Sequence, residues 1–286
     1  MQPLTRAVPA AADMTRSQGE TSMKRLQFWF ALACALGAAT GAGAARADAS
    51  QTLRFGLEAQ YPPFESKAAN GALQGFDIDV GNAVCNAAKL TCKWVETSFD
   101  GLIPALQGRK FDAINSAMNA TDQRRQAIDF TTVIYRVPTQ LIARADSGLE
   151  PTPASLKGKR VGVLQGSIQE AYANAHWAGA GVQVVAYQDQ NQAYADLTAG
   201  RLDGTLVLAP AGQRGFLSRP EAKGFAFVGP PVRDDKILGS GIAFGLRKGD
   251  DALKARLNAA IDKLKADGAV KALGRKYFGD IDISAK

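Results

Sequence analysis

Two neighbouring arginines lie where a helix tolerates positive charge least. The segment NATDQRRQAIDF (119–130) reads as a short helix with Thr121 as its expected N-cap. Arg124 and Arg125 fall in or beside the first turn, although a helix N-terminus already carries about +0.5 of an elementary charge. A guanidinium binds a carboxylate through two parallel hydrogen bonds, and N–H groups at a helix start add donors. The pattern therefore indicates a carboxylate-binding site at Arg124, with pairing to a nearby aspartate as the alternative.

Other side chains suited to ligand contact fall at the ends of predicted strands, where open α/β sheets bind their ligands. Glu58 ends the first predicted strand and either meets a cationic group or remains a surface carboxylate. Tyr61 and Phe99 either flank a ligand side chain or belong to the core. Gly166 and Ser167 form either a small anion site or a simple helix cap. Ser116, Ala117 and Asn119 deliver hydroxyl, amide and backbone groups close to Arg124.

Motifs for catalysis and metal binding are missing from the sequence. It contains no GxSxG elbow, no P-loop and no His/Cys metal spacing. The single histidine, His176, lies on a predicted helix and cannot by itself complete a nucleophile–base set. We therefore expect a binding protein without metal or cofactor, although carboxylates leave acid–base chemistry open.

The elements that must position these residues alternate between strands and helices. This β-α rhythm breaks at a turn-rich stretch over 146–159 and then restarts, so we expect an α/β fold of two lobes around a cleft. The predicted strands are 53–58, 92–97, 111–117, 160–165, 182–187 and 202–208. The predicted helices are 75–90, 99–110, 121–129, 167–177, 191–201 and a tail that starts at Asp250.

The N-terminal segment carries an export signal. Residues 23–47 combine Lys24 and Arg25 with an apolar run and end in Ala-Arg-Ala, which predicts a secretory signal peptide within a leader of 1–47. Met23 is a candidate start codon. The two cysteines after the leader, Cys85 and Cys92, are then most simply a disulfide.

Bulk composition restricts the partners. The chain has 286 residues, 46% of them hydrophobic, and a net charge of +7, which suits a globular protein. It has no basic block interleaved with aromatic residues, so we expect no nucleic-acid partner.

Several motifs in order give the chain a family resemblance. It resembles the periplasmic solute-binding proteins of ABC importers for polar amino acids, and most closely those for histidine and for lysine, arginine and ornithine. The resemblance spans nearly all of 51–284. The matching blocks are YPPFES, GFDIDVGNAVC, GLIPALQGRKFDAI, ATDQRRQAIDFT, SLKGKRVGVLQGS, DLTAGRLDG and ADGAVKALGRKYF.

The resemblance implies a type II periplasmic-binding-protein fold whose two lobes are joined by a two-strand hinge. Lobe I would comprise 48–136 and 240–286, and lobe II 137–239. It also implies a disulfide between Cys85 and Cys92, a small-molecule ligand, a periplasmic location and docking on an inner-membrane ABC permease. We expect a monomer.

The resemblance also assigns roles to single residues. Arg124 matches the clamp on the ligand α-carboxylate, Ser116 a serine that supports the ligand, and Glu58 an aspartate that reads a distal cation. Tyr61 and Phe99 match the walls around the ligand side chain. Contacts from the second lobe would come from Leu164, Gly166, Ser167 and Gln169.

This chain departs from the family pattern at four of the expected ligand contacts. Ala117 replaces a second serine, Asn119 a hydroxyl residue, and Ile168 a threonine that donates to the carboxylate. Leu208 replaces the aspartate that binds the α-ammonium. An apolar residue there suits opines or other N-substituted amino acids better than a plain amino acid.

Two further classes of function stay open. One is a periplasmic enzyme of the cyclohexadienyl dehydratase type on the same fold, for which Glu58 is the obvious acid. The other is a module that presents its ligand to a separate sensory receptor.

Overall fold

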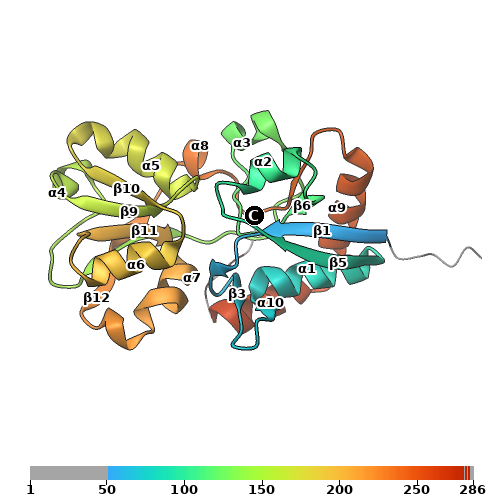
Figure 1. The fold of residues 1–286 in the computed structure, drawn as a ribbon, viewed down its shortest axis with the longest axis horizontal. Helices are drawn as coiled ribbons and strands as arrows, with labels where there is room; N and C mark the ends of the chain where they lie inside the picture. Colours follow the sequence, from blue (N-terminus) through green and yellow to red (C-terminus); the bar gives the residue numbers. More distant parts are fainter. Residues whose placement is uncertain (1–50, 280, 282, 284–286) are drawn as a thin grey trace, which may run out of the picture. The chain divides into compact units, whose positions relative to one another are not determined.

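The computed structural model describes residues 51–279, 281 and 283, and Figure 1 shows its course. The predicted leader and signal peptide lie outside these residues. The described chain forms two lobes, each built on a five-stranded mixed sheet with helices packed against it. The expected α/β, two-lobed fold is confirmed.

The first lobe contains the N-terminal strand and the C-terminal helices. Strand β1 runs parallel to both of its neighbours, and β13 returns antiparallel from the far end of the chain. In sheet order the strands are β5 (Leu90–Glu96), β1 (Gln51–Leu57), β6 (Ala113–Ile114), β13 (Gly245–Leu246) and β7 (Asp129–Phe130). The helices are α1 (Phe76–Ala87), α2 (Leu102–Gln107), α3 (Asp122–Ala127), α9 (Asp251–Ala266) and α10 (Ala269–Phe278). A small antiparallel sheet joins β2 (Gln60–Tyr61), β3 (Glu65–Lys67) and β4 (Leu73–Gln74).

The second lobe repeats the plan with the central part of the chain. Its strands, in sheet order, are β10 (Gln183–Tyr187), β9 (Arg160–Leu164), β11 (Gly204–Leu208), β8 (Thr139–Arg144) and β12 (Phe225–Val232). Its α-helices are α4 (Pro153–Leu156), α5 (Ile168–His176), α6 (Gln190–Thr198), α7 (Ala209–Gly212) and α8 (Asp235–Leu238). Short helical turns are η1 (Ala178–Ala180), η2 (Gln213–Leu217) and η3 (Pro220–Ala222). Strands β9, β10 and β11 are parallel, so their carboxyl ends share one edge of the sheet.

The two crossings between the sheets are hydrogen-bonded to each other. Between β7 and β8 the chain passes through Tyr135, and between β12 and β13 it passes through Ile242. The Ile242 N–H donates to the Tyr135 carbonyl at 2.8 Å, and the Ile134 N–H donates to the Ile242 carbonyl at 2.8 Å. This pair of extended segments is the two-strand connection expected of the fold.

Most predicted elements form within a few residues of their expected bounds, but the strand predicted at 111–117 is wrong in length. Only Ala113 and Ile114 join the sheet as β6. The residues after Ile114 make other contacts. The side chain of Asn115, for example, donates from Nδ2 to the Asp77 carbonyl at 2.7 Å. Ala117 then adopts a φ of 45°, which turns the chain toward α3.

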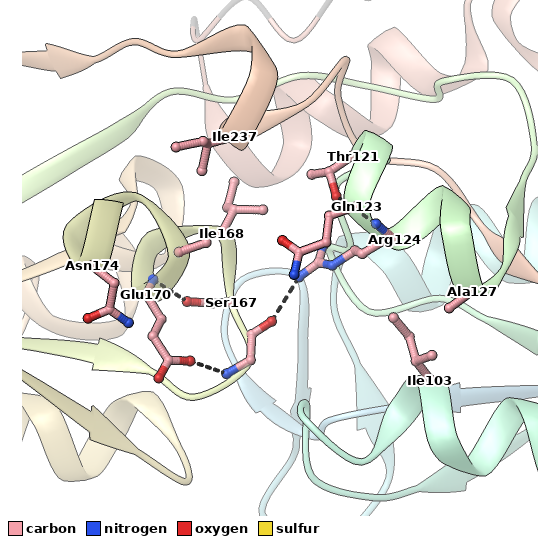
Figure 2. A pocket seen from close by; sticks show the side chains of 12 residues that line it. Ile103, Thr121, Gln123, Arg124, Ala127, Ser167, Ile168, Glu170, Asn174 and Ile237 are labelled. Atoms are coloured by element: carbon pink, nitrogen blue, oxygen red, sulfur yellow. Dashed lines mark hydrogen bonds between the residues drawn. The ribbon is translucent and has the colours of Figure 1, made fainter. Parts of the chain in front are cut away.

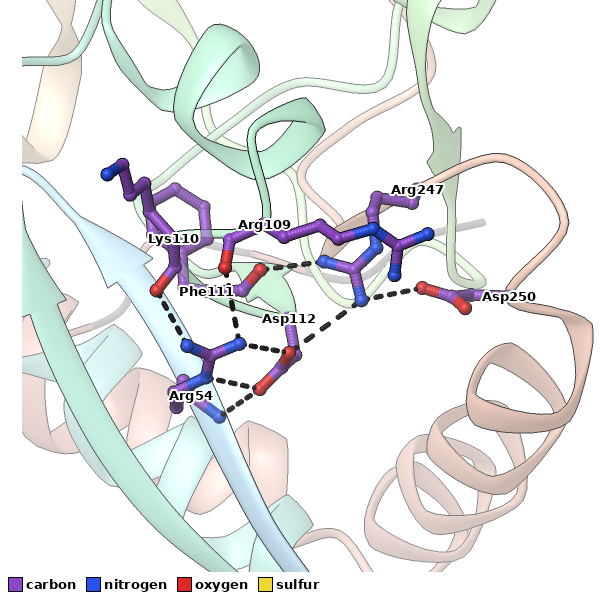
Figure 3. A network of polar contacts seen from close by, with 7 residues as sticks. All are labelled: Arg54, Arg109, Lys110, Phe111, Asp112, Arg247 and Asp250. Carbon is purple, nitrogen blue, oxygen red and sulfur yellow. Dashed lines mark hydrogen bonds and ion pairs between the residues drawn. The ribbon is translucent and has the colours of Figure 1, made fainter. Parts of the chain in front are cut away.

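Covalent and ionic contacts fasten the first lobe. The disulfide Cys85–Cys92 is confirmed, with 5.9 Å between its Cα atoms, and it joins the end of α1 to β5. In a second set of contacts, Asp112 accepts from Arg54 Nη2 at 2.8 Å and lies 3.7 Å from Arg247 (Figure 3). Arg247 also pairs with Asp250 at 2.9 Å. This network joins β1 to the residues that directly precede β6 and α9.

Candidate functional site

A small cavity between the two lobes collects most of the residues singled out in the sequence. Its volume is about 10 Å³, close to the space that one water molecule needs. A ligand the size of an amino acid therefore requires the walls to move apart. Ten of the thirteen predicted ligand residues line this cavity. They are Tyr61, Phe99, Ala117, Asn119, Arg124, Leu164, Ser167, Ile168, Gln169 and Leu208.

Arg124 joins the two lobes at one end of this cavity. Thr121 caps α3 as expected, accepting from the Arg124 N–H at 3.2 Å. The guanidinium donates from Nη1 to the Asn119 carbonyl at 2.8 Å, and from Nη2 to the Gly166 carbonyl of the other lobe at 3.0 Å (Figure 2). Burial lowers the pKa of Arg124 to about 10, so the group remains a cation at neutral pH. It forms no ion pair within residues 51–279.

Arg125, the second arginine of the motif, behaves differently. It is exposed, and its guanidinium carbon lies 5.2 Å from the centre of the Phe130 ring. The two arginines are therefore not equivalent, and only Arg124 reaches the interlobe space.

A larger groove continues outward from Arg124. It has a volume of about 390 Å³ and runs between α3 and α5, with Gln123 on one side and Asn174 on the other (Figure 2). Arg124 and Ser167 line both this groove and the small cavity. The groove therefore adjoins the cavity at the position where the lobes meet.

Two aromatic rings form the first-lobe wall of the cavity. Tyr61 is 6% exposed and Phe99 is 8% exposed. The Phe99 ring lies 5.4 Å below the Arg124 guanidinium, which fixes both groups by a cation–π contact. The Tyr61 hydroxyl accepts from the Leu208 N–H at 3.3 Å and so makes a second contact between the lobes.

The second-lobe wall comes from the ends of β9 and β11 and the start of α5. Ser167 caps α5 by accepting from the Glu170 N–H at 3.1 Å. Gln169 Nε2 donates to the Thr139 hydroxyl at 3.3 Å. Gly166 has a φ of 73°, and a Cβ there would lie 3.0 Å from the Asp100 Cα of the first lobe. The close approach of the lobes therefore depends on glycine at this position.

Glu58 lies outside this cavity and lines a second one, of about 650 Å³, together with Asp189 and Arg219 of the second lobe. The Glu58 side chain is 3% exposed, and neither carboxylate oxygen has a hydrogen-bond partner of normal geometry among the described residues. Burial, and then repulsion from Asp189, raise the pKa of Glu58 to about 7, and the nearby Gln60 N–H only partly offsets them. A cation placed beside this buried acid would stabilise its ionised form.

Ser116 is not on the cavity wall. Its hydroxyl donates to Glu65 Oε1 at 2.8 Å and accepts from the Glu58 N–H at 3.0 Å. The side chain is 1% exposed, so in this conformation its hydroxyl holds two acidic residues in place. Gly166 also stays outside the small cavity, lining the outer groove instead.

A buried acidic network behind the cavity was not predicted from the sequence. Asp77 accepts from the Tyr135 hydroxyl at 2.7 Å and from the Ala117 N–H at 2.6 Å. Burial raises the pKa of Asp77 to about 6, and burial together with the charge of Asp77 holds the pKa of Glu65 well above its usual range. Asp77 lies in the first turn of α1, where an acidic residue is commonly explained by its favourable interaction with the helix dipole. Its burial was therefore not evident from position alone.

Other chemistry is not indicated by the described part of the chain. It contains no group of three or more His, Cys, Asp or Glu side chains placed to hold a metal ion. None of its helices is both long and apolar enough to span a membrane. His176 lies on α5 with its Nε2 2.8 Å from Asp234, away from the cavity residues.

Comparisons with known proteins agree with this geometry. Residues 53–280 match the family model for bacterial extracellular solute-binding proteins, family 3. The histidine-binding periplasmic protein of Salmonella typhimurium is 44% identical over 261 residues, covering 91% of this chain and 99% of that protein. The lysine/arginine/ornithine-binding periplasmic protein of Escherichia coli is 48% identical over 228 residues, covering 80% and 88%. A solved Salmonella typhimurium periplasmic binding protein, described as highly specific for arginine, matches with a TM-score of 0.74 at 34% identity, covering 80% of this chain and all of that one.

Proposed function

Because the chain belongs to the bacterial extracellular solute-binding proteins, family 3, we propose that it is the periplasmic substrate-binding component of an amino-acid ABC importer. Its ligand would be a cationic amino acid or a derivative of one, delivered to a membrane permease. The relatives are named as binding proteins, so a binding role takes precedence over an enzymatic one.

One observation carries the proposal. Arg124 is a partly buried cation between the lobes that forms no ion pair within residues 51–279, and only two backbone carbonyls satisfy its guanidinium. A ligand carboxylate would accept two hydrogen bonds from it in the geometry that guanidinium favours. The remaining donors of Arg124 are available for this contact.

The opposite end of the ligand would lie against Glu58 and Asp189, in a cavity that Lys67 and Arg219 also line. Glu58 and Asp189 line the same cavity from opposite lobes, and neither carboxylate oxygen of Glu58 accepts a hydrogen bond of normal geometry from the described residues. A guanidinium or ammonium placed there would offset the repulsion between the two acids. The site therefore suits a molecule with a carboxylate at one end and a cation at the other. An opine is the second candidate, since Leu208 rather than an acid lines the cavity of Arg124.

Binding would proceed by closure of one lobe on the other. The ligand would first contact Arg124, Tyr61 and Phe99 on lobe I (48–136 and 240–286), and lobe II (137–239) would then close over it. Contacts made only in the closed form shift the population toward that form. The closed protein, exported by its signal peptide and monomeric, would then dock on the permease.

The proposal is tested by removing Arg124. We expect Arg124→Ala to weaken binding of arginine-like ligands at least about 30-fold, since losing a charged partner costs roughly 2–5 kcal/mol. Titration calorimetry of protein purified after export would measure the change. Arg125→Ala is the matched control, because that arginine is exposed and stacks on Phe130. A loss of less than threefold in Arg124→Ala, with a normal melting temperature, would refute the site.

A further inference from the structure

The cavity of Arg124 contains one cation and no anion. Of the ten side chains that line it, only Arg124 is charged. Leu208, at the end of β11, is 3% exposed, and its own N–H donates to the Tyr61 hydroxyl. Glu170 lines the adjoining groove, where its carboxylate accepts from the Gly166 N–H at 2.6 Å, while Glu58 and Asp189 line the other cavity. No acid therefore lines the cavity in which Arg124 would bind a carboxylate.

This charge pattern opposes a free α-amino acid. The α-carboxylate and α-ammonium share one carbon atom, so seating the first against Arg124 brings the second into the same cavity. There the ammonium would face the cation Arg124 and the apolar side chains of Leu208 and Ile168. A buried charge without a counter-ion is strongly disfavoured.

The neutral polar groups of the wall suit an uncharged nitrogen. Asn119 Nδ2 donates to the Leu238 carbonyl at 3.1 Å, and Gln169 Nε2 donates to the Thr139 hydroxyl at 3.3 Å. These contacts use only the amide nitrogens, so each amide oxygen keeps its capacity to accept. An amide N–H of a ligand can donate to such an oxygen without bringing in a charge, and its acyl group can pack on Leu208.

From this pattern we propose that the preferred ligand has a cationic group at one end and a carboxylate at the other. The end that contacts Arg124 has a net negative charge. Its α-nitrogen is acylated or absent, as in an Nα-acyl-arginine or an ω-guanidino acid. An opine meets the same rule, because a second carboxylate offsets its ammonium. The inference rests on the proposed function, since it assumes that Arg124 binds a carboxylate and that Glu58 receives the distal cation.

The test compares ligands that differ only at the α-carbon. Protein from the full chain, purified after export, is unfolded and refolded to remove bound ligand and is then titrated with L-arginine, Nα-acetyl-L-arginine, 5-guanidinopentanoate and octopine. We expect at least one of the last three to bind tenfold or more tightly than arginine. The wild-type comparison needs no variant and so does not depend on the folding of a mutant.

Introducing an acid at position 208 gives a second test. Leu208→Asp supplies the missing acid, so arginine should gain at least tenfold in affinity while Nα-acetyl-arginine loses affinity. Leu208→Asn is the matched control, with the same shape but no charge, and thermal melts verify that both variants fold.

The outcomes separate the two proposals. Arginine binding tenfold more tightly than all three analogues would overturn this inference and leave the proposed function standing. If none of the four compounds binds at millimolar concentration, and lysine, ornithine and histidine do not bind either, the proposed function fails and the inference fails with it.

Discussion

Lowering the pH from 8 to 6 is expected to weaken the binding of a guanidino ligand about tenfold. The prediction rests on Glu58, whose pKa is raised to about 7, first by burial and then by the negative charge of Asp189. A cation seated against Glu58 favours the ionised carboxylate, so binding displaces a proton wherever the free protein holds one.

The magnitude follows from the fraction of ionised Glu58 in the free protein. With a pKa of about 7, that fraction is about 0.9 at pH 8 and about 0.1 at pH 6. If the bound group stays ionised over this range, affinity scales with the fraction and falls about tenfold. The sign for stability is opposite. Since the folded pKa is raised above the ordinary value of 4.5, Glu58 destabilises the ligand-free protein as the pH rises from about 4.5 to 7.

The assay is titration calorimetry at pH 6, 7 and 8 in buffers of different ionisation enthalpy, which also counts the protons released. Glu58→Gln should lower the affinity and remove the pH dependence. Glu96→Gln is the matched control, because Glu96 lines the same cavity but pairs with Lys67 at 2.7 Å and is half exposed. Equal wild-type affinities at pH 6 and 8, within twofold and without proton release, would refute the reasoning.

Two further predictions concern closure and stability. Gly166→Ala should weaken ligand binding tenfold or more, because its Cβ would lie 3.0 Å from the Asp100 Cα of the other lobe. Gly158→Ala is the control, because Gly158 has a similar φ of 75° and open space around it. This variant should share the loss of roughly 1 kcal/mol in stability but keep its affinity for the ligand. Equal affinities for both variants would contradict the closure argument. Replacing Cys85 and Cys92 with alanine should lower the free energy of unfolding by about 2 kcal/mol, since the bridge spans only seven positions. Urea titration would measure it, and an unchanged midpoint would show that the bridge contributes nothing.

The sequence by itself determined the elements and the family. Alternating strands and amphipathic helices predicted the α/β lobes, and Thr121 predicted the start of α3, where its side chain accepts from the Arg124 N–H. These features are local, because a cap or a periodic apolar pattern acts over a few residues. The family resemblance went further and named ten of the residues that line the cavity. It could do so because matched blocks imply the same fold, which already contains the long-range contacts.

Only the tertiary structure decided what each polar group faces. Ser116 was expected to support a ligand, yet its hydroxyl donates to Glu65, which lies 51 positions away in the chain. The raised pKa of Glu58 depends on burial and then on Asp189 of the other lobe, and Arg124 is held by the carbonyl of Gly166, 42 positions away. Burial and charge at these groups are sums over neighbours that folding brings together from distant segments. A local sequence pattern does not predict the burial and charge environment of these groups, so the chemistry of the site depends on how the two lobes pack.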